Sequence, residues 1–393
     1  MKYADEYRDG RLARAVAGRI AEAADPAATY HFMEFCGGHT HAISRYGIED
    51  LLPPHVRLIH GPGCPVCVLP VGRIDAAIRL AQDPRVTLCT YGDLLRVPAS
   101  NGMSLLRAKA AGADIRMVYS TLDAIRIAEQ EPHREVVFFA IGFETTTPPS
   151  AHAVKLAAAK GLRNFTLFCN HVLTPAAIQN ILESPDVRKL GRVRIDGFIG
   201  PAHVSTVIGT EPYVFFAEEF SKPVVIAGFE PLDVMQAILM LVRQINEGRH
   251  EVENQYGRAV RQNGNQHAKE DVADLFELRK AFEWRGLGIV PYSGLRLKVA
   301  YAEFDAERRF GIEYVPTPDN PACECGAILR GVKKPADCKL FGTVCTPDTP
   351  MGSCMVSAEG ACAAHWTYGR FRDGARTDVG PEPPHTRRQG FRG

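Results

Sequence analysis

The sequence has little excess of either charge and lacks both a long hydrophobic run and an apolar segment near its N-terminus. Its longest apolar stretch, Val234–Val242, is interrupted by Gln236 and is far too short to cross a bilayer. Residues 1–10 are rich in charged side chains, so we expect no secretory signal peptide. A formal net charge of +1 gives no electrostatic reason to expect nucleic acid or an acidic membrane as partner. We therefore expect a cytoplasmic protein.

Nine of the eleven cysteines fall into two groups, and Cys89 and Cys169 lie in the long span between them. Three lie early, at Cys36, Cys64 and Cys67, and six lie late, within residues 323–362. In the cytoplasm the default state of cysteine is the thiol, so such groups indicate metal or redox chemistry rather than a disulfide framework. Two separated groups predict two cooperating sites.

The chain of 393 residues is too long for one ordinary core, and two or three domains are expected. Short apolar runs alternate with helical patterns up to residue 230. The runs predict eight strands, at 30–35, 56–60, 86–91, 114–119, 135–141, 164–170, 195–199 and 223–227. The helical patterns include 11–24, 71–82, 104–111, 150–160 and 175–183. Two doubly wound parallel sheets, divided near residues 125–133, are preferred over one closed barrel.

Beyond residue 230 the expected elements change. Helical patterns cover 234–245, 252–260 and 272–278, and short strands are expected within 284–300. Residues 311–365 have little periodicity, so we expect this segment to need a metal to hold it. The Arg-rich tail is predicted to be disordered.

Polar and reactive residues follow directly after many of the predicted strands. Ligands of parallel α/β folds bind beyond the carboxyl ends of strands, so these residues predict a cleft. The motifs are Cys36-Gly37-Gly38-His39, Gly61-Pro62-Gly63-Cys64, Tyr91-Gly92-Asp93, Gly142-Phe143-Glu144-Thr145-Thr146, Asn170-His171, Gly200-Pro201-Ala202-His203 and Gly228-Phe229-Glu230.

The late cysteines lack the two CxxC pairs of a zinc ribbon. A cubane iron–sulfur cluster needs four thiolates and tolerates irregular loops between them. Their spacing favours an iron–sulfur cluster over zinc, disulfides or free thiols, but does not select four of the six.

Each early motif can be interpreted as a functional site or as an ordinary structural feature. Cys64 and Cys67 form a CxxC at a helix start, which favours a redox dithiol over half a zinc site or incidental thiols. Cys36 and His39 flank two glycines and would suit soft iron or copper, although a nucleophilic or simply buried cysteine fits equally well.

The polar residues that follow the later strands also allow both a functional and a structural interpretation. Glu144, Thr145 and Thr146 would position or protonate a ligand, or serve as helix caps. His171 and His203 stand at strand ends, where a histidine is more often structural than catalytic.

Taken together, the motifs resemble the HypD family of [NiFe]-hydrogenase maturation proteins over nearly the whole chain. The resemblance is carried by Cys36-Gly37-Gly38-His39-Thr40-His41, Gly61-Pro62-Gly63-Cys64-Pro65-Val66-Cys67, Gly142-Phe143-Glu144-Thr145-Thr146 and Pro201-Ala202-His203-Val204-Ser205. It is also carried by Cys323, Cys338, Cys345 and Cys362, whose gaps of 14, 6 and 16 residues follow the family's pattern.

The resemblance implies a [4Fe-4S] cluster on Cys323, Cys338, Cys345 and Cys362, with Cys325 and Cys354 as non-ligands. It also implies two α/β domains and a third domain that carries the cluster. From the residue patterns we place two doubly wound parallel-sheet α/β domains at 1–130 and 131–230, a helical, cysteine-rich iron–sulfur domain at 231–365, and a disordered tail at 366–393.

The resemblance also implies a function. With HypC as partner, such a protein assembles the Fe(CN)2CO group of [NiFe]-hydrogenases, the cyanide coming from HypE. We expect Cys36, assisted by His39, to bind the iron and the Cys64–Cys67 couple to exchange electrons with the cluster. Glu144, Thr145, Thr146 and His203 are expected to orient ligands or move protons. The alternatives are a cluster-fed disulfide reductase and a non-catalytic metal-binding scaffold.

Overall fold

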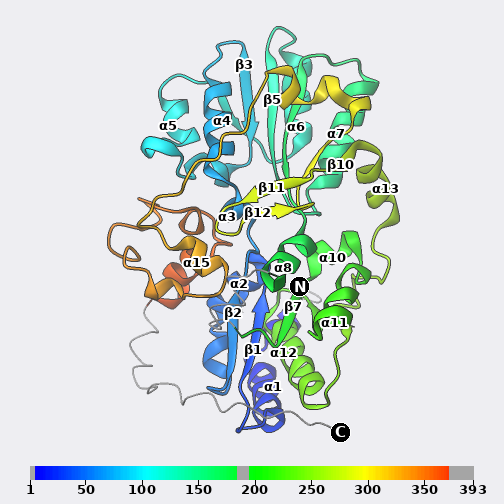
Figure 1. Ribbon diagram of the computed structural model, residues 1–393, viewed down its shortest axis with the longest axis vertical. Helices are drawn as coiled ribbons and strands as arrows, with labels where there is room; N and C mark the ends of the chain where they lie inside the picture. The colour runs from blue at the N-terminus through cyan, green and yellow to red at the C-terminus, as the bar shows by residue number, and fades with distance from the viewer. Residues whose placement is uncertain (1–4, 184–193, 371–393) are drawn as a thin grey trace.

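The computed structural model describes residues 5–183 and 194–370, and it contains two parallel β-sheets joined by a cysteine-rich C-terminal region. Figure 1 shows one sheet in the upper half of the molecule and the other in the lower half, with the cysteine-rich segment beside their junction. The expected α/β class is therefore confirmed, and a single closed barrel is excluded by the two separate sheets.

The lower sheet has the strand order β2-β1-β7-β8-β9, and every pair is parallel. Helices cover both of its faces. Buried side chains of α1, α2 and α12 pack on one face, and those of α8, α10 and α11 on the other. The strands are β1 (Tyr30–Glu34), β2 (Val56–His60), β7 (Gly197–Pro201), β8 (Val224–Ala227) and β9 (Val252–Asn254). The helices are α1 (Gly10–Ala23), α2 (Gly37–Tyr46), α8 (Thr174–Glu183), α10 (Ala202–Ile208), α11 (Val214–Phe220) and α12 (Pro231–Asn246).

The upper sheet has the order β4-β3-β5-β6, again all parallel. Its nearly continuous apolar strands are buried because α4 and α5 pack on one face and α6 and α7 on the other. The strands are β3 (Val86–Thr90), β4 (Ile115–Met117), β5 (Glu135–Gly142) and β6 (Phe165–His171). The helices are α4 (Val71–Ala81), α5 (Leu105–Ala110), α6 (Thr121–Gln130) and α7 (Thr147–Ala159).

All eight predicted strands are present, but their pairing does not follow the predicted boundary at residues 130 and 131. That boundary falls between β4 and β5, which belong to the same sheet. The lower sheet instead combines strands from 30–60 and 197–254, so the upper sheet is inserted between them in sequence. Periodicity identifies a strand but carries no information about its neighbours, which explains the error.

The C-terminal part contains less helix than expected. Residues 252–254 form β9, where a helix was expected over 252–260, and the helix expected over 272–278 ends at Leu275. Two antiparallel strand pairs follow, β10 with β13 and β11 with β12, consistent with the strands expected near 284–300. The bounds are α13 (Gln266–Leu275), β10 (Phe276–Leu278), β11 (Ala281–Trp284), β12 (Gly288–Pro291), β13 (Leu295–Leu297) and α14 (Ala306–Arg309).

Three of the late cysteines lie in short helical turns: Cys325 in α15 (Cys325–Leu329), Cys354 in the 3₁₀ turn η8 (Ser353–Met355) and Cys362 in α16 (Ala361–Ala364). The π-helical turn η9 (His365–Gly369) follows α16. The predicted tail thus begins later than residue 366. The disorder expected for the tail concerns 371–393, which lie outside the described residues.

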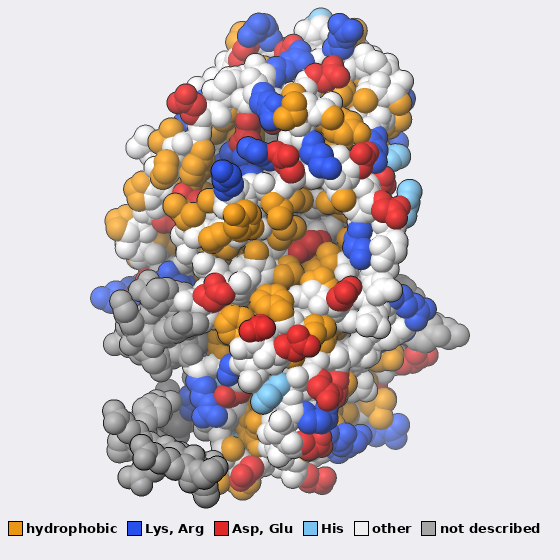
Figure 2. Space-filling view, turned by 45° about the vertical axis from the view of Figure 1, so that its right-hand side comes forward, with side chains coloured by type: hydrophobic (Ala, Val, Ile, Leu, Met, Phe, Trp, Pro, Cys, Tyr) orange, Lys and Arg blue, Asp and Glu red, His pale blue; other side chains and the backbone are white. Residues whose placement is uncertain are grey.

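No helix in residues 5–183 and 194–370 is both long and apolar enough to span a membrane. Figure 2 shows one face of the molecule, on which hydrophobic side chains gather across the middle and charged side chains toward the ends.

Candidate functional site

Cys36 lies where the strand order of the lower sheet reverses. It follows β1, and His203 lies in the first turn of α10, directly after the neighbouring strand β7. Such a switch point opens a crevice at the carboxyl ends of the two strands, and ligands of open α/β sheets bind there. The Cys36 Sγ atom lies 3.1 Å from His203 Nδ1. A thiol and an imidazole far apart in sequence are therefore in direct contact.

A buried carboxylate holds the Cys36 loop in place. Glu34 is fully buried at the end of β1 and accepts the Cys36 backbone N–H at 2.9 Å through Oε2. Its Oε1 atom accepts the Thr40 hydroxyl at 2.5 Å and lies 2.7 Å from His60 Nδ1. Because these bonds tie β1, β2 and α2 together, the Glu34 carboxylate fixes the position of the Cys36 backbone.

The His39 imidazole is turned away from the Cys36 sulfur, and only the His39 backbone N–H bonds the thiol. Its Nε2 atom lies 3.0 Å and 3.1 Å from the carbonyl oxygens of Ala227 and Gly228, at the end of β8, and the residue is fully buried. The imidazole that the structure places at the sulfur is that of His203, which sequence reasoning had treated as more often structural.

The CxxC motif lies against the same loop. Cys64 and Cys67 form a disulfide across α3 (Pro65–Val68), and the Cys67 N–H donates to Cys64 Sγ at 3.2 Å. The Gly37 N–H donates to the Gly63 carbonyl at 2.8 Å. A Cβ at Gly63 would lie 2.2 Å from the Cys36 backbone nitrogen, so only glycine permits this approach.

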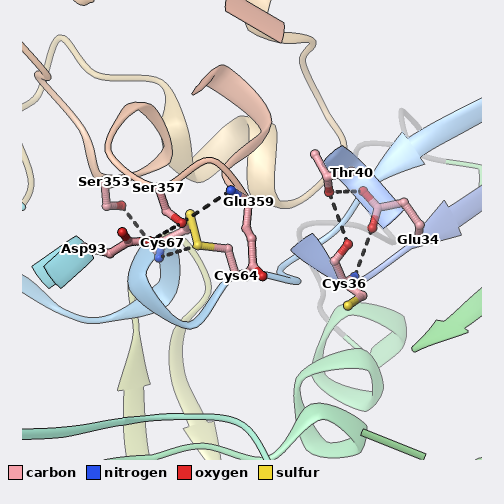
Figure 3. Close-up of a disulfide and its surroundings, with 9 residues drawn as sticks. All are labelled: Glu34, Cys36, Thr40, Cys64, Cys67, Asp93, Ser353, Ser357 and Glu359. Carbon is pink, nitrogen blue, oxygen red and sulfur yellow. Dashed lines mark hydrogen bonds between the residues drawn. A yellow bond between two sulfur atoms is a disulfide. The ribbon is translucent and has the colours of Figure 1, made fainter. Parts of the chain in front are cut away.

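Glu359 joins the two early thiol sites. Its side chain packs on Gly37, and Figure 3 shows it between the disulfide and Cys36. Two cavities of about 430 and 440 Å³ meet here, since His203 and Glu359 line both. The second cavity is also lined by Pro65 and Val66 of the CxxC turn. Sequence neighbours of the early cysteines, namely Gly38 in the first cavity and Gly63, Pro65 and Val66 in the second, therefore line these cavities.

The Gly142–Thr146 motif is divided between cavity and core. Thr145 and Thr146 line the second cavity, and the Thr146 hydroxyl donates to the Phe143 carbonyl at 3.1 Å. Glu144 is buried instead, and its carboxylate accepts the N–H and the hydroxyl of Thr174, both at 2.8 Å. Burial raises the pKa of Glu144 to about 7.

The electrostatics favour neutral partners at Cys36. Burial, followed by the nearby Glu359 charge, raises the pKa of the Cys36 thiol well above its ordinary value. Burial, helped by His39, lowers the pKa of His203 to about 4, so its imidazole is neutral at pH 7. Burial also raises the pKa of Glu359. A neutral imidazole has one ring nitrogen that can accept a hydrogen bond from the neighbouring thiol.

Several late cysteines converge in the C-terminal region. The Cys325 thiol lies beside the thiols of Cys323 and Cys362, and a Cβ at Gly352 would lie 2.4 Å from Cys323 Sγ and 2.5 Å from Cys325 Sγ. The Met351 N–H donates to Cys345 Sγ at 3.4 Å. Burial raises the pKa of the Cys345 thiol, and the nearby thiols of Cys323 and Cys325 contribute to this increase. Cys338 instead lies beside Glu324.

This thiol-rich donor set, with a backbone amide aimed at one sulfur, fits a thiolate-bound iron–sulfur cluster. Within the described ranges, no group of three or more His, Cys, Asp or Glu side chains has the arrangement that would hold one metal ion. The structure places Cys325, the expected non-ligand, closer to the other thiols than Cys338.

The C-terminal region reaches the disulfide directly. Turn η8 packs on α3, and the Ser353 hydroxyl donates to the Cys67 carbonyl at 2.8 Å. Ser357 donates to Asp93 at 2.8 Å, which ties the same segment to the end of β3. The late cysteines, the disulfide and Cys36 thus lie along one continuous set of contacts.

Sequence reasoning missed Glu34 and Glu359. Glu34 gave a usable signal, because an acid within the apolar run Phe32-Met33-Glu34-Phe35 must be paired when it is buried. Glu359 gave none, since it lies in an aperiodic segment far from the early motifs.

Comparisons with known proteins identify the family of this chain. The family profile HypD, described as "Hydrogenase formation hypA family", matches residues 11–369. "Hydrogenase maturation factor HypD" of Rhizobium leguminosarum bv. viciae is 78% identical over 96% of this chain and 98% of its own length. The proteins of that name from Cupriavidus necator and Escherichia coli (strain K12) are 67% and 46% identical, over 95% and 94% of this chain and 98% of their own lengths. The chain therefore belongs to the HypD family of hydrogenase maturation factors.

Proposed function

We propose that Cys36 holds the iron of the Fe(CN)2CO group during its assembly, with a partner of the HypC class supplying a second thiolate. Thiolates donate electron density to Fe(II), and the bound cyanide and carbon monoxide accept it. The observation that carries this proposal is the contact between Cys36 Sγ and His203 Nδ1 beside two cavities that share His203 and Glu359. HypE would deliver the cyanide to this complex.

His203 would prepare the thiol for iron. Metal ligation needs the thiolate, whereas burial keeps Cys36 protonated. In the tautomer protonated at Nε2, Nδ1 of His203 accepts a hydrogen bond from the thiol across 3.1 Å, and the thiol would lose its proton as iron binds the sulfur. Glu34 keeps the sulfur in place during this step through its bond to the Cys36 N–H.

The disulfide would act as a two-electron reservoir. Its reduction takes up two electrons and two protons and yields the thiols of Cys64 and Cys67. Both residues are buried, which favours an electron route within the protein over a large external disulfide substrate. This burial argues against the general disulfide reductase considered above.

A [4Fe-4S] cluster on the late cysteines would supply one-electron transfer. The chain's own residues bring that region to the disulfide, because Ser353 bonds the Cys67 carbonyl. Cys323, Cys345 and Cys362 would hold the cluster, together with Cys338 by the family's spacing.

Infrared spectroscopy of the anaerobically purified complex with the HypC-class partner tests the role of Cys36. We expect cyanide and carbonyl stretches that vanish in Cys36→Ala and persist in Cys89→Ala, a matched control buried in β3. Stretches of full intensity in Cys36→Ala would refute the proposal. The Cys64→Ser/Cys67→Ser double variant should fail to support maturation. Normal maturation would favour a non-catalytic scaffold.

Iron analysis and visible absorption test the cluster. We expect the wild type to be coloured, and Cys338→Ala to lose colour and iron while Cys325→Ala keeps both. The reverse result would make Cys325 the fourth ligand, as its contacts with Cys323 and Cys362 allow. A colourless protein with one zinc per chain would overturn the cluster altogether.

A further inference from the structure

The ring of Phe229 lies between two imidazoles. Its centroid is 4.9 Å from that of His39 and 5.4 Å from that of His203, with interplanar angles of 51° and 47°. Phe229 lies in the turn between β8 and α12 and lines the first cavity. No role proposed above uses this aromatic residue.

One end of this stack is fixed. His39 lies against the carbonyl oxygens of Ala227 and Gly228, in the same turn that carries Phe229. Gly38 closes the other side of the ring, since a Cβ there would lie 2.7 Å from Phe229 Cδ1. The ring therefore has little freedom to move, and its tilted contacts have the geometry that aromatic pairs favour.

The other end of the stack needs such support. Among the residues that the structure describes, the His203 ring has no hydrogen-bond partner except the Cys36 sulfur. Metal-binding and catalytic histidines are usually oriented by a hydrogen bond to the second ring nitrogen, and that bond is missing here. Packing against Phe229 is the contact that fixes the plane of this imidazole.

We propose that Phe229 is a positioning residue that holds the His203 imidazole against the Cys36 thiol, and that the imidazole of His39 acts through Phe229. Gly38 serves the same arrangement by leaving room for the ring. The inference rests on Cys36 being the working thiol, but it concerns the geometry at that thiol and not the maturation reaction.

The test measures the rate at which iodoacetamide alkylates Cys36 in the full-length, anaerobically purified chain, by mass spectrometry of the Cys36 peptide. We expect Phe229→Leu to slow alkylation about two- to tenfold, the ratio equivalent to one aromatic contact, because the His203 imidazole is no longer held at hydrogen-bond distance from the reacting sulfur. Phe229→Tyr keeps the ring and should restore the wild-type rate. Phe220→Leu, at the end of α11, is the matched control and should change nothing.

A double-mutant cycle separates positioning from simple packing. If Phe229 acts through His203, Phe229→Leu has no further effect in a His203→Ala background. The inference is wrong if the two substitutions slow alkylation independently, so that their rate factors multiply in the double variant. It is also wrong if folded Phe229→Leu reacts as fast as the wild type or faster. If the infrared stretches vanish in Cys36→Ala but Phe229→Leu still slows alkylation in the His203→Ala background, only the positioning role is refuted. Persistent stretches would refute only the proposed function.

Discussion

Replacing Glu144 with glutamine should remove a pH dependence of stability that the structure places in the core. The pKa of Glu144 is raised from 4.5 to about 7 by burial, although the N–H and hydroxyl of Thr174 favour the charged form. The neutral acid is therefore preferred in the folded state. Its contribution to stability is complete below pH 4.5 and is lost as the pH rises through 7.

The magnitude follows from the two pKa values. A shift from 4.5 to about 7 corresponds to about 3 kcal/mol, of which about 2 to 3 kcal/mol is lost between pH 5 and pH 8. Glutamine does not titrate, and its carbonyl and amide groups can still bond the N–H and hydroxyl of Thr174. We therefore expect the free energy of unfolding of Glu144→Gln to exceed that of the wild type increasingly as the pH rises.

Urea unfolding at several pH values, followed by circular dichroism, measures this difference. Glu218→Gln on α11 is the control, because Glu218 is exposed and should show a difference that is flat with pH. A flat difference for Glu144→Gln, or one that grows toward low pH, would show that burial does not hold the carboxyl group in its neutral form.

Two further substitutions test how the cleft is held together. Gly63→Ala should lower the free energy of unfolding by about 1 to 3 kcal/mol, because the added Cβ would meet the Cys36 backbone. Gly18→Ala is the control. It lies in open space on α1 and should raise the free energy of unfolding by about 0.5 to 1 kcal/mol. Equal melting temperatures for the two would contradict the close approach. Arg73→Met should cost about 3 to 5 kcal/mol, because the buried guanidinium bonds the Cys169 carbonyl at 2.9 Å and pairs with Glu307. The exposed Arg85→Met is its control, and similar urea midpoints for the two would refute the role of Arg73.

Much of the secondary structure was predictable because each element leaves a local pattern. The apolar run Val136–Ala140 predicts a strand buried on both faces, and it lies within β5. The prediction of a helix at 252–260 was wrong, because β9 is a partly buried edge strand of three residues followed by turns. So short an element shows no hydrophobic period.

The site was predictable only as a set of motifs. Glycines and reactive residues after strands located the cleft, since parallel strands end at one edge of a sheet. The partner of each side chain was not predictable. His39 is near Cys36 in sequence yet bonds β8, whereas His203, 167 residues away, touches the sulfur.

The sequence by itself determined the chemistry available to this protein: which thiols, imidazoles and carboxylates exist, and which short strands and helices carry them. Only the tertiary structure decided the pairing of β1 with β7, the insertion of the upper sheet and the packing of Glu359 on Gly37. The physical reason is that local patterns are set by neighbouring residues. Strand order and burial instead depend on contacts between segments distant in the chain, which minimise the free energy of the whole molecule.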